Sequence, residues 1–244
     1  MAHLAHYREA HPLPFVITHW INLVAMVVLL VTGFMIHFPV AGTMGVCRGA
    51  HIFFGIVLFI NCICRVVMAF FVRSAPTGGT RKTVTDYKTW LPQKDNRHQG
   101  GAWIKYYLFL KKDHPLAAKL GVPQKISYLM IPILIVLMFY TGLCLWGTTM
   151  EWPICQAGIA ALGGTMSVRI IHYFGMFVFI CFMFIHIYLA NVEGLAPTFL
   201  MFFRKEHGGL TWNSKEQRID GEDLLGHAPE DYHPLRKETE EPAA

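Results

Sequence analysis

The chain has 244 residues, of which 54% are hydrophobic and only 15% are charged. Soluble domains carry about a quarter charged residues, so this composition argues against a soluble protein and favours a membrane protein. The formal net charge of +5 gives no argument for nucleic-acid binding, because the basic residues follow the asymmetry that membrane topology imposes.

Four long segments without Asp, Glu, Lys or Arg predict the membrane spans. These segments are 10–47, 49–64, 126–150 and 170–192. A span needs about 20 mostly apolar residues, and the second segment reaches this length because the apolar run resumes after Arg65. We therefore predict an all-α fold, an integral membrane four-helix bundle. Its spans are expected near 13–37, 49–72, 126–148 and 168–192.

The first span is expected to be a permanent helix. Residues 1–12 are polar and His-rich, and the apolar stretch after them is too long for a cleavable signal peptide. Residues 152–168 are also uncharged, but Pro153, Gly158, Gly163 and Gly164 interrupt them. A re-entrant or surface segment is therefore predicted there in place of a fifth span.

Two polar regions flank or separate the spans. The mixture of aromatic, apolar and Lys residues in 103–112 predicts a helix lying in the membrane interface. We predict that residues 1–205 form the transmembrane domain and that residues 206–244 form a polar cytoplasmic tail that orders against a partner.

The basic residues predict the orientation. Of 21 Lys and Arg residues, one precedes the first span, eleven lie in 73–125 and six lie beyond residue 193. With four spans these three regions share one side of the membrane. Because Lys and Arg accumulate on the cytoplasmic side, both termini are predicted to be cytoplasmic, in a bacterial inner membrane.

Four histidines inside the spans are the leading site candidates, because ionisable residues in spans are costly and usually functional. His172 and His186 are 14 residues apart, which places them on one helix face about 21 Å apart. Helix direction puts His51 at the depth of His172, near the periplasm, and His19 at the depth of His186, near the cytoplasm. Two pairs result, the outer pair His51 and His172 and the inner pair His19 and His186.

Haem b is the cofactor that these pairs favour. Facing histidines from separate helices can supply both axial ligands of a haem iron. A lone buried histidine is more often an interhelical hydrogen bonder, but two matched levels make coincidence improbable. Zinc or copper would require cysteines or carboxylates at the same depth, and none is present.

Further residues are predicted to surround the cofactors. Arg48 and Arg169 each precede an outer histidine by one helical turn and are candidate partners of haem propionates. Arg65 either snorkels to the interface or, as we prefer, pairs with propionates of the inner haem. Gly55 and Gly175 allow close approach of a macrocycle or of a neighbouring helix.

The remaining motifs carry weaker signals. The dipeptides Thr32-Gly33 and Thr141-Gly142 are interpreted, from the residues alone, as ordinary helix packing. Cys47 and Cys155 both fall in predicted periplasmic connections, so a disulfide between them is a hypothesis. The sequence contains no CxxC or CxxCH motif that would indicate covalent haem or an iron–sulfur cluster.

The ordered motifs resemble the cytochrome b subunit of membrane-bound nickel–iron hydrogenases. They are His19-Trp20-x-Asn22, Thr32-Gly33-Phe34, Arg48-x-x-His51-x-x-x-Gly55, Arg65 with Phe70 and Phe71, Tyr107-Leu108-Phe109-Leu110, Thr141-Gly142, His172-x-x-Gly175 and His186-Ile-Tyr-Leu. The likeness runs from about residue 13 to residue 205. It extends more loosely to the gamma subunits of formate dehydrogenases and to thiosulfate reductase cytochromes.

The resemblance implies two haems, one held by each histidine pair, and a role in electron transfer. Electrons would pass from the iron–sulfur and catalytic subunits of a periplasm-facing hydrogenase or formate dehydrogenase to menaquinone or ubiquinone in the bilayer. The formate dehydrogenase branch has an Asn and a Gly associated with quinone binding before the third span. Residues 121–125 depart from that pattern, so this contact is not carried over.

We therefore predict an electron-transfer subunit of a respiratory complex, with no catalytic residue of its own. A transporter that relays protons through histidines would require inverted repeats and broken spans, which the sequence does not show. A haem-free membrane anchor is the other alternative, and it leaves four buried histidines unexplained.

Overall fold

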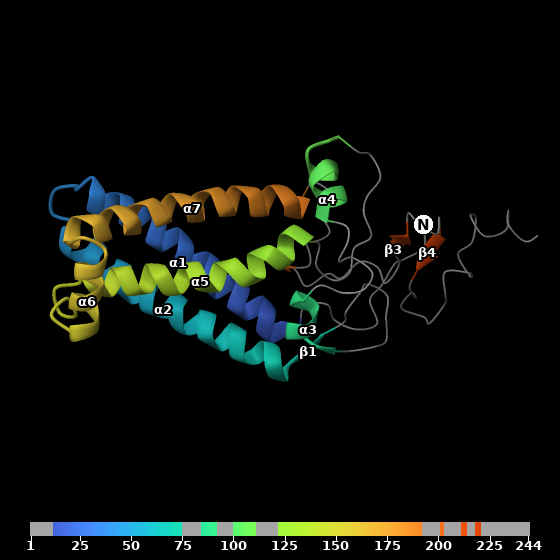
Figure 1. The fold of residues 1–244 in the computed structure, drawn as a ribbon, viewed down its shortest axis with the longest axis horizontal. Coiled ribbons are helices and arrows are strands. Elements are labelled where there is room, and N and C mark those ends of the chain that lie inside the picture. Colours follow the sequence, from blue (N-terminus) through green and yellow to red (C-terminus); the bar gives the residue numbers. More distant parts are fainter. Residues whose placement is uncertain are drawn as a thin grey trace, which may run out of the picture. The chain divides into compact units, whose positions relative to one another are not determined.

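The computed structural model describes residues 12–74, 84–91, 100–110, 122–191, 201–202, 211–213 and 218–220. Four long helices dominate this part of the chain (Figure 1). They are α1 (Leu13–His37), α2 (Met44–Phe71), α5 (Val122–Leu145) and α7 (Thr165–Asn191). In the described residues these four are long and apolar enough to cross a membrane, which confirms the predicted all-α, four-span fold.

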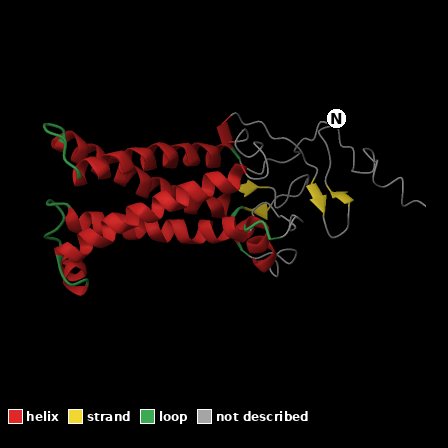
Figure 2. Ribbon diagram, turned by 90° about the horizontal axis from the view of Figure 1, so that it is seen from above, coloured by secondary structure: helices red, strands yellow, loops and turns green. Residues whose placement is uncertain are grey.

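The chain divides into two compact units. One comprises Pro14–Val66 and Met130–Glu193, and the other comprises Met1–Leu13, Val67–Leu129 and Gly194–Ala244. In the first unit α1, α2, α5 and α7 run alongside one another in both views (Figures 1 and 2). This unit contains all four candidate histidines.

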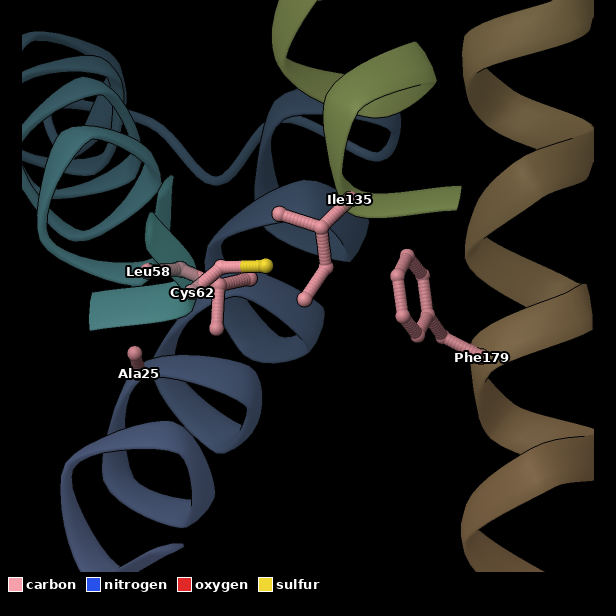
Figure 3. Packing of buried hydrophobic residues seen from close by; sticks show 5 residues of the cluster. All are labelled: Ala25, Leu58, Cys62, Ile135 and Phe179. Atoms are coloured by element: carbon pink, nitrogen blue, oxygen red, sulfur yellow. The ribbon is translucent and has the colours of Figure 1, made fainter. Parts of the chain in front are cut away.

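All four helices contribute to one apolar cluster in the middle of the bundle. Figure 3 shows its members, Ala25, Leu58, Cys62, Ile135 and Phe179. Phe179 lies seven residues from each of the two histidines of α7, so the cluster occupies the depth between the two histidine levels. The stacked rings of Phe59 and Phe139, 3.9 Å apart, extend the contact between α2 and α5.

The outward faces of the spans are apolar and exposed. Val27, Phe53, Ile133 and Phe184, one from each long helix, keep 44%, 60%, 62% and 71% of their side chains exposed. Such continuous apolar surface is unfavourable in water and suits lipid as the surrounding solvent. The multi-pass membrane location follows from this surface and from the length of the helices.

Four span boundaries differ from the prediction by three to five residues, and α5 and α7 begin earlier than expected, at Val122 and Thr165. Helix α2 begins at Met44 and not near residue 49, because the exposed Arg48 can reach polar surroundings from within the first turns of a helix. Helix α5 ends at Leu145 and not near residue 148. There the Leu143 carbonyl at the end of the helix accepts the Thr149 hydroxyl at 2.6 Å and the Trp146 N–H at 3.3 Å.

The uncharged segment after α5 forms a short helix, α6 (Pro153–Ala161). Pro153 starts it at a position where a missing N–H costs nothing. Gly163 and Gly164, with φ of 85° and 110°, end it in the left-handed region and turn the chain into α7. Nine residues span only about 14 Å, so α6 is too short to be a fifth span.

The predicted interface helix is shorter than expected. Helix α4 (Gly100–Tyr107) ends before the expected residue 112. The Leu110 N–H donates back to the Lys105 carbonyl at 2.8 Å, and Phe109 takes a φ of 58°. This αL turn closes the helix.

The remaining elements are short. Antiparallel pairs join β1 (Arg73–Ser74) to β2 (Val84–Thr85) and β3 (Thr211–Asn213) to β4 (Arg218–Asp220), with Arg73 opposite Thr85 and Thr211 opposite Asp220. Next to β2, α3 (Tyr87–Trp90) packs around buried Asp86, which accepts hydrogen bonds from Ser74 and Trp90. Most of the predicted polar tail, 206–244, lies outside the described residues.

Candidate functional site

The structure brings the predicted inner histidines together. The ring centroids of His19 on α1 and His186 on α7 lie 6.1 Å apart, with an angle of 49° between the planes. Phe182, one turn before His186, stacks on the His186 ring at 5.6 Å. The His186 side chain is exposed and that of His19 is half-buried.

The predicted outer histidines also face each other. The rings of His51 on α2 and His172 on α7 lie 6.2 Å apart at 64°. Both side chains are half-buried. Each of the two levels therefore joins α7 to a different helix, α1 at the inner level and α2 at the outer level.

These separations match two imidazoles on opposite sides of one metal ion. Two metal–nitrogen bonds of about 2 Å plus half of each ring span roughly 6 Å. No group of three or more His, Cys, Asp or Glu side chains that could hold a metal occurs in the described residues. A two-histidine site suits a metal whose remaining ligands come from a macrocycle, since haem supplies its own four nitrogens.

Two threonines fix the outer rings, and the sequence interpretation missed them. Thr32 Oγ1 lies 2.9 Å from His51 Nδ1, and Thr141 Oγ1 lies 2.8 Å from His172 Nδ1. Both threonines are buried, with 7% and 0% exposed. The repeated Thr-Gly dipeptide, interpreted as helix packing, was the signal that could have identified them.

The glycines after these threonines lie against the same rings. A Cβ on Gly33 would come within 3.6 Å of His51 Cε1, and a Cβ on Gly142 within 3.4 Å of His172 Cε1. The missing side chains let the rings approach α1 and α5 closely. The two Thr-Gly dipeptides thus provide both a hydrogen-bond partner and space for the ring.

The predicted Gly55 and Gly175 serve helix contacts. A Cβ on Gly55 would meet the Leu29 side chain at 4.0 Å, and a Cβ on Gly175 would collide with the Met138 sulfur. Of the two alternatives for these glycines, a macrocycle or a neighbouring helix, the structure places a neighbouring helix there. Contact with a cofactor stays a prediction for both.

The three predicted arginines have different surroundings. Arg48 and Arg169 are exposed, each one turn before an outer histidine. The Arg65 guanidinium lies over the Phe15 ring at 3.8 Å, a cation–π contact. Because Phe15 is four residues before His19, Arg65 lies within one turn of the depth of the inner pair.

A buried amide ties α1 to α2 beside the inner pair. The Asn61 side chain donates to the Thr18 carbonyl at 2.7 Å and to Asn22 Oδ1 at 2.6 Å. Asn22, three residues after His19, therefore serves to join α1 to α2 through its hydrogen bond with Asn61.

The disulfide hypothesis for Cys47 and Cys155 is wrong. Both thiols are free. Cys47 Sγ packs against Met35 Sδ at 3.7 Å, whereas Cys155 packs in a buried cluster with Cys144 and Val168. Both cysteines were expected on the same side of the membrane, but Cys47 lies in α2 and Cys155 in α6, and each packs against different neighbours.

Of the other histidines, one lies in a span and three lie near the N-terminus. His37 stacks on Tyr173 at 4.1 Å and 15°, so it belongs to neither pair. His3, His6 and His11 lie outside the described residues.

Comparison with known proteins points in the same direction as the histidine geometry. A family model described as prokaryotic cytochrome b561 matches residues 10–204. Two curated relatives carry the name "Probable Ni/Fe-hydrogenase B-type cytochrome subunit". The one from Bradyrhizobium diazoefficiens is 27% identical over 203 residues, which cover 75% of this chain and 77% of the relative. The one from Azotobacter chroococcum is 29% identical over 203 residues, which cover 75% and 79%.

Proposed function

This chain belongs to the prokaryotic cytochrome b561 family, and from this premise we propose that it is the di-haem membrane subunit of a hydrogenase-type respiratory complex. Family membership implies haem b and electron transfer in the membrane. The number of haems, their ligands and the electron partners are the substance of the proposal.

The two facing histidine pairs carry the proposal. His51 and His172 would hold the outer haem, and His19 and His186 the inner haem, because each pair has the ring separation of a bis-imidazole metal site. When bound, a haem iron supplies one-electron oxidation and reduction. The protein would supply the iron ligands, the spacing between the two levels and the buried apolar cluster between them.

Arginines are proposed to neutralise the propionates. Arg48 and Arg169 would serve the outer haem from one turn away, and Arg65 the inner haem from beside Phe15. Guanidinium groups bind carboxylates through two parallel hydrogen bonds. Their placement at the two levels, and not in the apolar middle of the bundle, supports this role.

The partners are proposed from the relatives. Both are named as hydrogenase cytochrome subunits, so we infer that this chain receives electrons from the iron–sulfur subunit of a nickel–iron hydrogenase and passes them to menaquinone or ubiquinone. The outer pair would face the incoming electrons and the inner pair the quinone. A formate dehydrogenase partner is the less favoured alternative, since neither relative bears that name.

We propose that the protein lies in the bacterial inner membrane with both termini in the cytoplasm. The supporting observation is that 18 of 21 Lys and Arg residues fall before the first span, in 73–125 or beyond residue 193. A reporter enzyme that works only in the cytoplasm should be active when it is fused after Ala244. Activity of a periplasm-dependent reporter there would reverse the assignment of outer and inner haem.

The function is tested with the purified complex. Pyridine haemochrome analysis should give about two haems b per chain, since there are two ligand pairs. His186→Ala should lose the inner haem, keep reduction of the outer haem by the catalytic subunit, and lose quinone reduction. His37→Ala is the matched control, because this span histidine lies outside both pairs and should keep both haems.

Three results would contradict this function. A spectrum without reduced b-type bands would favour a transporter or a haem-free anchor. Full quinone reduction by His186→Ala, at normal haem content, would remove the inner-haem assignment. Co-purification with a catalytic subunit other than a hydrogenase would change the proposed partner.

A further inference from the structure

We propose that Thr32 and Thr141 are positioning residues that set the tautomer, the ring orientation and thereby the reduction potential at the outer histidine pair only. The inference rests on the proposed function, because it assumes a haem between His51 and His172. It goes beyond that function by naming the groups that make the two levels electronically different.

The hydrogen-bond partners of each hydroxyl determine its role. A threonine hydroxyl has one proton to donate and two lone pairs. Thr32 Oγ1 lies 2.7 Å from the Val28 carbonyl, and Thr141 Oγ1 lies 2.8 Å from the Leu137 carbonyl. A carbonyl oxygen only accepts, so the single hydroxyl proton is directed to it, as is usual for a threonine inside a helix.

It follows that the histidine is the donor in each contact. The Thr32 oxygen accepts the Nδ1–H of His51, and the Thr141 oxygen accepts the Nδ1–H of His172. Because Nδ1 carries the proton, Nε2 has the free lone pair that a metal requires.

The same arrangement occurs twice, on different helices. In α1 and α5 a Thr-Gly dipeptide places its hydroxyl on Nδ1 and its glycine against Cε1 of the ring. In α2 and α7 the histidine follows an arginine by three residues. Two independent occurrences of one geometry, on both ligands of one level, indicate a built feature and not incidental packing.

The inner pair has different surroundings. Across the described ranges, no hydrogen bond to the ring of His19 or His186 is present, and besides the facing His19 ring the stacked Phe182 ring lies against His186. Hydrogen bonding at the distal nitrogen raises the basicity of a ligating histidine. A more basic ligand stabilises the oxidised iron. The threonines are therefore expected to make the reduction potential of the outer haem lower than it would be without their hydroxyls.

The test uses Thr32→Val, Thr141→Val and the double variant in the intact complex. Valine keeps the shape and removes the hydroxyl. Spectroscopic redox titration should show a positive shift of the outer haem potential in each single variant, a larger shift in the double variant and no shift of the inner haem. Binding of haem at the outer level should weaken about 10–100-fold, the usual effect of losing such a partner.

Two controls separate positioning from packing. Thr32→Ser and Thr141→Ser restore a hydroxyl and should return the outer potential to the wild-type value. Thr18→Val removes a buried hydroxyl that donates to the Phe15 carbonyl at 2.9 Å and should leave the outer potential unchanged. An unchanged outer potential in the double Thr→Val variant would overturn the inference.

A measurement on the unaltered protein covers the case in which the valine variants fail to assemble. Redox-difference infrared spectra with isotope-labelled histidine report whether Nδ1–H of a ligand is hydrogen bonded. Hydrogen-bonded Nδ1–H at the outer level supports the inference, and free Nδ1–H overturns it. If the wild-type protein has no haem between His51 and His172, the proposed function itself is wrong. The haem content per chain, measured separately, distinguishes this case from failure of the present inference.

Discussion

The outer and inner histidine pairs have nearly the same ring separation, 6.2 and 6.1 Å, but different means hold their rings. Threonine hydroxyls and adjacent glycines fix the outer rings from α1 and α5. An aromatic ring stacks on His186 at the inner level. The comparison teaches that a pair of facing histidines creates a ligand site, whereas the groups behind the rings decide how rigid and how electron-rich that site is.

The largest expected effect distinguishes the two levels by removing a ligand from each. His51→Ala should leave only the inner haem, and His19→Ala should leave only the outer haem, because each iron loses one of two axial ligands. Haem content per chain should fall by about half in both, with different remaining bands in the low-temperature spectrum. Identical residual spectra would mean that the pairs are not separate sites.

The apolar cluster between the levels should affect both haems equally. Phe179→Ala leaves a cavity where a 5% exposed ring now packs, and such truncations cost about 3–5 kcal/mol in a well-packed core. Thermal loss of the two haem signals should shift to lower temperature together. Loss of one signal alone would show that the cluster belongs to a single level.

Gly142→Ala should weaken the outer level selectively. The added Cβ would lie 3.4 Å from His172 Cε1, at the short limit of van der Waals contact, so it takes up the free space beside the ring, at an expected cost of about 1 kcal/mol. Outer haem occupancy should fall while the inner haem persists. Gly147→Ala is the control, because a Cβ there has nothing within 4 Å; equal effects of the two variants would contradict the steric explanation.

The smallest effect is expected at the inner level. Phe182→Leu removes the ring that stacks on His186, and such aromatic pairs contribute about 1 kcal/mol. Inner haem affinity should fall a few-fold, with the outer haem unaffected. Phe184→Leu replaces a 71% exposed ring on the same helix and should change neither level.

The sequence predicted the four-span fold and the two histidine pairs because both depend on local patterns. Uncharged runs of span length mark the helices, and the axial rise of 1.5 Å per residue converts spacing into depth. Depth and helix direction were sufficient to pair His51 with His172 and His19 with His186.

Side-chain contacts between helices could not be predicted in the same way. Which face of α1 meets α2 decides that Thr32 reaches His51 and that Cys47 meets Met35 and not Cys155, and rotation about the helix axis is set by packing of the whole bundle. A single Thr-Gly dipeptide in a span is equally compatible with close helix packing. Only their repetition before each outer histidine carried the signal.

The central claim, two haems held by the two histidine pairs, is tested most directly by an electron cryomicroscopy map of the purified complex. The account predicts one macrocycle between His51 and His172 and a second between His19 and His186, each iron with an imidazole on both faces. A map with a single macrocycle, or with an iron ligated by any other residue of the chain, would contradict it.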